Sequence, residues 1–278
     1  MVGSCAGCSP TRIAAPTMPD PTLKPRKTPS GKDLAAIGVK PGRLLPILNA
    51  LVLICTVVQA PLSNAQAPTK APGDSVRTHC SPEVTVQSRD RADARSVCRG
   101  ALAAIDFLAE QGVEVSEPLE VNIVDTLPAG VDASAVGCFN PRDHEAYVLS
   151  YKMLLNRGKW LDLQIDRRLY ESIASHEVAH ALTWCAAASP PLALQATEYI
   201  AFVTMFMTMD PAQLNALLAA NPGIVFESDW EVSELGYSLN PIRFGIMAYR
   251  HYLRKPDPAA FIRAILAGKA FGPRYYIY

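Results

Sequence analysis

Residues 173–182 read IASHEVAHAL, and this stretch carries the strongest pattern in the chain. Apart from Glu177, the residues between and around its two histidines are small or apolar. On an α-helix, residues four apart share a face, so His176 and His180 point the same way. Two imidazoles at this spacing can bind one zinc ion, and Glu177 then lies within reach of water on the metal. The stretch predicts a buried helix that carries a metal site.

A catalytic zinc site needs a third protein ligand and an open position. Glu198 is the best candidate, because it is the only carboxylate between Glu177 and Asp210. It falls on the next expected helix, which a short turn containing Pro190 and Pro191 places beside the first. A carboxylate in an otherwise apolar helix is costly to bury unless it is paired, and metal ligation would pair it. The alternative is that Glu198 lies at a polar edge of its helix.

The sequence HEVAH, followed by Glu198 after 17 intervening residues, resembles the gluzincins, the thermolysin-like clan of zinc metallopeptidases. The motif match covers residues 173–202, and the layout matches from about residue 88 to residue 208, as in minimal single-domain members. The resemblance implies one zinc ion held by His176, His180 and Glu198. It implies that Glu177 is general base and acid in peptide-bond hydrolysis by a zinc-activated water.

The chain departs from the gluzincin pattern around the third ligand. Many members have Asn just before the ligand Glu and Asp four residues after it, where this chain has Thr197 and Phe202. The group that orients a ligand histidine must then come from elsewhere. The family also implies a strand beside the cleft, for which residues 135–139 or 145–151 are candidates. For an oxyanion donor the candidates are Tyr237, Arg243, Tyr249 and His251.

The order of expected elements is helix, strands, then helices, which is typical of an α+β fold. We expect a small zincin-like domain with a mainly helical C-terminal half. Periodicity and turn residues predict a strand at 119–124, a hairpin within 135–149, and helices at 88–112, 166–187, 192–208, 211–220, 241–254 and 258–267. We expect this domain to span residues 86–278, after a flexible segment at 66–85 whose first part, residues 66–78, is rich in Pro, Ala and Thr.

The first 65 residues differ in charge from the remainder. They carry a net charge of +5 and the rest carries −5, so the chain as a whole is neutral and gives no sign of a nucleic-acid partner. The uncharged apolar run Leu44–Ala60 follows Lys40 and Arg43, and small residues come after it. This is typical of a secretory signal cleaved after Ala65, which predicts a periplasmic or secreted protein without a lasting membrane anchor. An uncleaved anchor is the alternative, although 17 residues is short for a spanning helix.

Four cysteines remain after this leader, and an even number in an oxidising compartment favours disulfides. Of the three pairings, we expect Cys80–Cys98 and Cys138–Cys185. The first would tether the N-terminal segment to a helix, and the second would tie a strand to the end of the 166–187 helix. A zinc–cysteine site is the alternative, but the spacing contains no short C-x-x-C.

Three hypotheses remain open from the sequence. The first is an exported zinc peptidase acting on a peptide or protein substrate. The second is a zinc-binding but non-proteolytic protein, such as a periplasmic binding or scaffold protein. The third is a metal-free structural protein in which HEVAH occurs by accident. Substrate specificity and oligomeric state are not predicted by any of these patterns.

Overall fold

The computed structural model describes residues 75–189 and 191–271. The segment 1–65, with its expected signal sequence, lies outside the described residues. Within the described part, no helix is both long and apolar enough to cross a bilayer.

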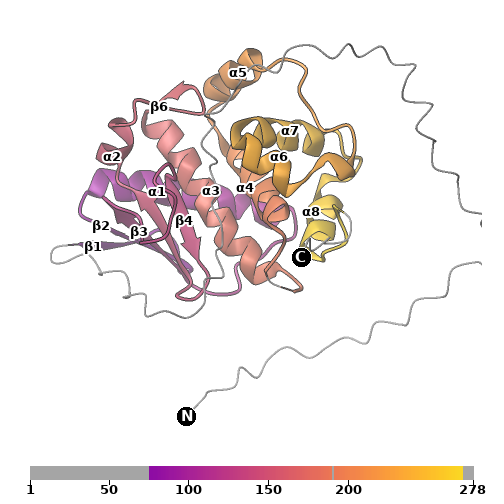
Figure 1. Ribbon diagram of the computed structural model, residues 1–278. Helices are drawn as coiled ribbons and strands as arrows, with labels where there is room; N and C mark the ends of the chain where they lie inside the picture. Colours follow the sequence, from indigo (N-terminus) through magenta and orange to yellow (C-terminus); the bar gives the residue numbers. More distant parts are fainter. Residues whose placement is uncertain (1–74, 190, 272–278) are drawn as a thin grey trace, which may run out of the picture. The chain divides into compact units, whose positions relative to one another are not determined.

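A five-stranded mixed sheet forms the first half of the domain, in the order β1-β2-β3-β5-β4 (Figure 1). The three central strands are parallel, and the outer strands β1 and β4 are antiparallel to their neighbours. The strands are β1 (Val76–His79), β2 (Val84–Ser88), β3 (Leu119–Val124), β4 (Gly137–Asn140) and β5 (Glu145–Leu149). The expected strand at 119–124 is confirmed as β3, and the expected hairpin is confirmed as β4 and β5.

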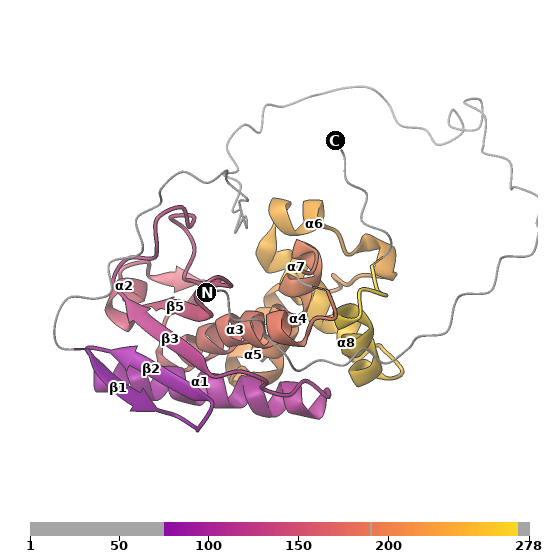
Figure 2. The ribbon, with the colours of Figure 1, turned by 90° about the horizontal axis from the view of Figure 1, so that it is seen from below.

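Two long helices pack on this sheet and against each other. Helix α1 (Arg91–Glu110) packs on β2, and helix α3 (Arg167–Ala186) packs on β4 and β5 (Figure 2). Both begin at an aspartate whose side chain accepts backbone N–H bonds, Asp90 for α1 and Asp166 for α3. Such N-caps satisfy N–H groups that have no partner within the helix, which explains where both helices start.

The second half of the described chain is helical. Helix α4 is apolar and buried through most of its length, and α7 packs against it. The remaining elements are α2 (Tyr151–Leu155), the β6 (Lys159–Trp160) and β7 (Leu163–Gln164) ribbon, α4 (Leu194–Thr208), α5 (Pro211–Ala220), the 3-10 turn η2 (Asp229–Glu231), α6 (Glu234–Leu239), α7 (Pro241–Leu253) and α8 (Pro258–Leu266). The mixed composition and the helical C-terminal half confirm the predicted α+β class.

The expected flexible segment at 66–85 is wrong where the structure describes it. Residues 76–79 form β1, and β2 begins at Val84, so the folded domain starts about ten residues before the predicted position 86. Val84 and Val86 are fully buried and pair with Leu119 and Val121 of β3. The partner that stabilises this short strand comes more than thirty residues later, which local composition does not indicate.

The predicted cysteine pairing is half right. Cys80, in the turn between β1 and β2, forms a disulfide with Cys98 of α1, with a Cα–Cα distance of 5.2 Å. Cys138 and Cys185 form no disulfide with each other, so the second expected pairing is wrong. The reason is strand alternation, since Gly137 and Phe139 of β4 face α3 and Cys138 faces the other side.

Candidate metal centre

Helices α3 and α4 bring the three predicted ligands together. The Nε2 atoms of His176 and His180 lie 3.2 Å apart on one face of α3. Glu198 of α4 places one carboxylate oxygen 3.6 Å from the Nε2 atom of His176 and the other 3.7 Å from that of His180. All three side chains are at most 15% exposed. Helix α4 therefore places Glu198 beside the two histidines, as expected.

These distances can be compared with those of a zinc site. Nitrogen and oxygen ligands bind zinc tetrahedrally at about 2.0–2.1 Å, which puts two ligand atoms about 3.3 Å apart. The three measured separations lie close to this value. One Glu198 oxygen, Oε2, is also buried without a hydrogen-bond partner among the described residues, which a cation would provide. The donor set and its spacing therefore fit a single zinc ion held by three protein ligands.

The charges of the three groups are strongly coupled. Burial alone would raise the pKa of Glu198, but His180 and His176 lower it below the usual value. Burial would likewise lower the pKa of His176, but Glu198 and Glu177 outweigh that effect and raise it. Burial lowers the pKa of His180 to about 4, so its imidazole is neutral. An anionic carboxylate and a neutral imidazole are the forms that bind a metal ion, so Glu198 and His180 are ready to bind one and His176 would release its proton on binding.

Glu177 lies next to the first ligand and is 5% exposed. Burial raises the pKa of its carboxyl to about 7, against a lowering influence from His176. A general base is most effective when its pKa lies near the working pH, so this environment suits proton transfer. Gly137 of β4 lies directly against this side chain. A Cβ atom at Gly137 would be 2.6 Å from the Glu177 Cγ and Cδ atoms, so glycine is required for β4 to approach α3 this closely.

Residues 84–274 match the model of a family of unknown function, DUF6639. The chain belongs to the DUF6639 family. The match includes every ligand candidate and all elements from β2 through α8. Comparison with curated proteins and with solved structures gave no match.

Aromatic residues support the site in this DUF6639 protein where the gluzincin pattern has a carboxylate. The Phe202 ring meets the His176 ring edge-to-face, with centroids 4.7 Å apart. Gly245 of α7 lies against the other part of Phe202, and a Cβ atom there would be 2.4 Å from the ring. Packing of α7 on α4 thus fixes Phe202, which in turn restricts the orientation of His176. In the sequence, Phe202 was visible only as a departure from the gluzincin pattern, without an explanation.

Of the four candidate oxyanion donors, Tyr237 is the one whose hydroxyl interacts with Glu198. It is buried on the short helix α6, and its hydroxyl hydrogen-bonds the Glu198 carboxylate and lowers its pKa. We therefore assign Tyr237 to positioning Glu198.

The other three candidates have other surroundings. Arg243 is exposed at the start of α7, and Tyr249 is buried with its ring against Phe206. His251 lies between the Tyr199 hydroxyl, 2.9 Å from its Nδ1 atom, and the Asp229 carboxylate, 3.1 Å from its Nε2 atom. Its role in the DUF6639 protein is to link α7 to α4 and η2.

Proposed function

We propose that this protein is a zinc-dependent peptidase of the gluzincin type, with the ion held by His176, His180 and Glu198. The observation that carries the proposal is the meeting of these three donors at zinc-ligand spacing. A structural zinc site has four protein ligands around the ion, whereas three are proposed here. The adjacent Glu177, with its pKa raised to about 7, also suits a hydrolytic site.

Each part of the site has a role in this reaction. A zinc ion bound there supplies Lewis-acid chemistry, by acidifying water and polarising a carbonyl group. Glu177 accepts a proton from the attacking water and then donates it to the leaving amine of the peptide. Tyr237 holds the Glu198 carboxylate in position, and the Phe202 ring restricts His176.

Strand β4 offers a place for the substrate. It is the last strand of the sheet, so its outer edge has no strand partner among the described residues. An extended peptide can add to such an edge through backbone hydrogen bonds. The contact between Gly137 and Glu177 means that a peptide bound along β4 would lie beside the proposed base.

Gly137→Ala should reduce peptide hydrolysis by about 100-fold, because its Cβ atom forces Glu177 out of position and misplacement by about 1 Å has effects of this size. The zinc content should match that of the wild type, since the substitution contacts none of the three ligands. Steady-state hydrolysis and metal analysis measure the two effects. Cys138→Ala is the matched control, because its side chain faces away from α3. Equal activity of Gly137→Ala and wild type would contradict the role of this contact.

The Cys80–Cys98 disulfide supports an exported location. Disulfides persist in the periplasm and outside the cell and are rare in the cytosol. We therefore propose that the domain folds and acts after export, on a peptide or protein substrate. No nucleic-acid partner is proposed.

The proposed function is tested by metal removal. The full chain, incubated with fluorescently labelled unfolded casein, should cleave it, and a chelator should abolish cleavage. Stoichiometric zinc should restore it, because the ion supplies the Lewis acid and Glu177 alone is a weak catalyst.

Two outcomes would overturn the proposal. Cleavage that persists after the metal has been removed would show that the activity does not depend on this site. Bound zinc without cleavage of casein or of a peptide library would favour the non-proteolytic binding protein instead.

A further inference from the structure

A second group of metal-binding side chains lies at the C-terminal end of α3. Glu117, His144 and Cys185 each place a donor atom within 4.8 Å of the others. They come from three separate segments, namely the loop before β3, the turn between β4 and β5, and the last turn of α3. Cys185 follows His180 by five residues, so one helix carries ligands of both groups.

His144 is held in one orientation at this position. Its backbone adopts a positive φ of 56°, which non-glycine residues rarely do. Its Nδ1 atom lies 3.3 Å from the backbone carbonyl oxygen of Pro118, and its ring packs edge-to-face on Phe139. Because the Nδ1 proton is donated to this carbonyl, Nε2 is unprotonated and its lone pair can bind a metal ion. This Nε2 atom lies 2.7 Å from the Cys185 sulfur. Ligand histidines in metal sites are commonly fixed by a hydrogen bond of this kind.

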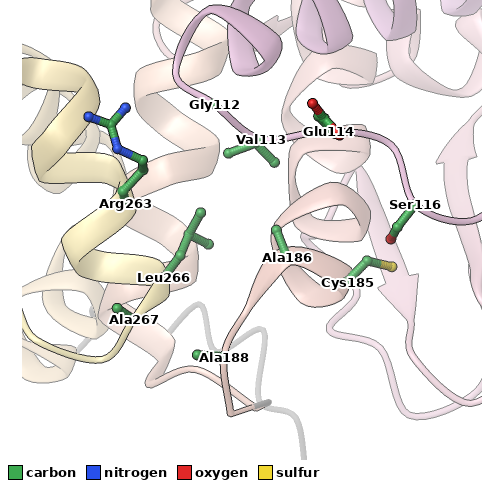
Figure 3. Close-up of a pocket in the computed structure, with 10 residues that line it drawn as sticks. All are labelled: Gly112, Val113, Glu114, Ser116, Cys185, Ala186, Ala188, Arg263, Leu266 and Ala267. Carbon is green, nitrogen blue, oxygen red and sulfur yellow. The ribbon is translucent and has the colours of Figure 1, made fainter. Parts of the chain in front are cut away.

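Cys185 is half-buried and borders a cavity. Cys185 and Ser116 line one side of a cavity of about 370 Å³, with Arg263 and Leu266 of α8 on the opposite side (Figure 3). Glu117 is 66% exposed and can adjust its position. The His144 side chain is 22% exposed, so the group lies close to the surface of the domain.

We propose that Cys185, His144 and Glu117 form a second metal site, for a thiophilic divalent cation such as zinc, separate from the His176 group. Sulfur, imidazole nitrogen and carboxylate oxygen are all ligands that zinc accepts. Binding releases the thiol proton to solvent, and the metal–sulfur bond forms to the resulting thiolate. Nitrogen and sulfur ligands on one zinc lie about 3.5 Å apart, so the contact between His144 and Cys185 opens by under 1 Å.

The surroundings of Cys185 do not favour a nucleophilic cysteine. Burial and the Glu117 carboxylate raise the pKa of its thiol, whereas a nucleophilic cysteine needs a lowered pKa. A bound cation reverses the effect of Glu117, because the carboxylate then coordinates the same ion as the thiolate. The proposal does not depend on the peptidase function.

Cobalt titration tests the site. The full chain is used with His176 and His180 replaced by alanine, so that only the second site remains, and with Cys5, Cys8 and Cys55 replaced by serine. One Co²⁺ per chain should bind and give a sulfur-to-cobalt charge-transfer band in the near ultraviolet. Cys185→Ser should abolish the band, whereas the matched control Cys138→Ser should leave it unchanged.

The result that overturns the proposal is the absence of this band, its persistence in Cys185→Ser, or its loss in Cys138→Ser. If the double-alanine background does not fold by circular dichroism, the same titration is made on the chain that keeps both histidines. Two ions should then bind, and Cys185→Ser should remove one of them together with the sulfur band. Failure of the peptidase proposal leaves the band in place, so the two outcomes can be distinguished.

Discussion

Glu177→Gln should lower the rate of peptide hydrolysis by about 1,000-fold while leaving the zinc content unchanged. General acid–base catalysis contributes about 100- to 10,000-fold, and glutamine cannot accept the proton from water. The amide occupies nearly the same volume beside Gly137, so α3 should remain intact. Hydrolysis rate and metal analysis of the same sample measure both effects.

Glu171→Gln is the matched control for this substitution. Glu171 lies on the same helix and forms an ion pair with Arg99 on α1, away from the ligand group. Its substitution should leave the hydrolysis rate within about twofold, because it changes a partly exposed ion pair of small energetic value. A Glu177→Gln variant that retains wild-type activity would show that the assigned base is wrong.

Gly100→Ala should destabilise the fold by about 3 kcal/mol, the upper part of the range for overpacking a core. A Cβ atom at this position of α1 would be 2.1 Å from the Glu171 backbone oxygen and 2.9 Å from the Ala174 Cβ atom. The obstacle is backbone on α3, which cannot rotate aside, so the two helices must separate. Because α3 carries His176 and His180, zinc affinity should fall as well. Urea denaturation of the apo- and zinc-loaded chain measures both effects.

Gly236→Ala provides the control, since its Cβ atom would meet only the Ser233 hydroxyl at 3.2 Å, at the end of a side chain. This variant should change stability by less than about 1 kcal/mol, in line with the higher helix propensity of alanine. If Gly100→Ala proved as stable as the wild type, the close packing of α1 on α3 described above would be wrong.

The sequence predicted the central helices and the three side chains that meet between them because the signal there is local. Residues four apart on a helix share a face, which groups His176 with His180. The two prolines in sequence before the next helix indicate a short turn, which predicts that Glu198 lies beside these histidines. The apolar periodicity of α1 and the alternation of β3 are equally local. These elements were predicted to within a few residues.

The features that the sequence did not reveal depend on contacts between distant segments. Helix α6 has six residues, too few for a periodic pattern, so Tyr237 could be named only as one of four candidates. The predicted Cys138–Cys185 disulfide was wrong because the number of cysteines does not indicate the face of β4 on which Cys138 lies. Glu117 and His144 are 27 residues apart, and only the β3–β5 pairing brings them together.

The close approach of Gly137 to Glu177 was likewise missed, because a glycine in a short strand is common. The need for glycine at position 137 becomes clear only when the Glu177 side chain on the facing helix is placed. Gly245 against Phe202 is a second case of the same kind.

The most direct test of the account is the metal content of the full chain with Cys5, Cys8, Cys55 and Cys185 replaced by serine. This background removes the three cysteines of residues 1–65 and the thiol of the second proposed site, and it leaves His176, His180 and Glu198 in place. The account predicts about one zinc per chain, lost when His176 and His180 are both replaced by alanine. A chain that contains no zinc and takes up none when it is added would contradict the account.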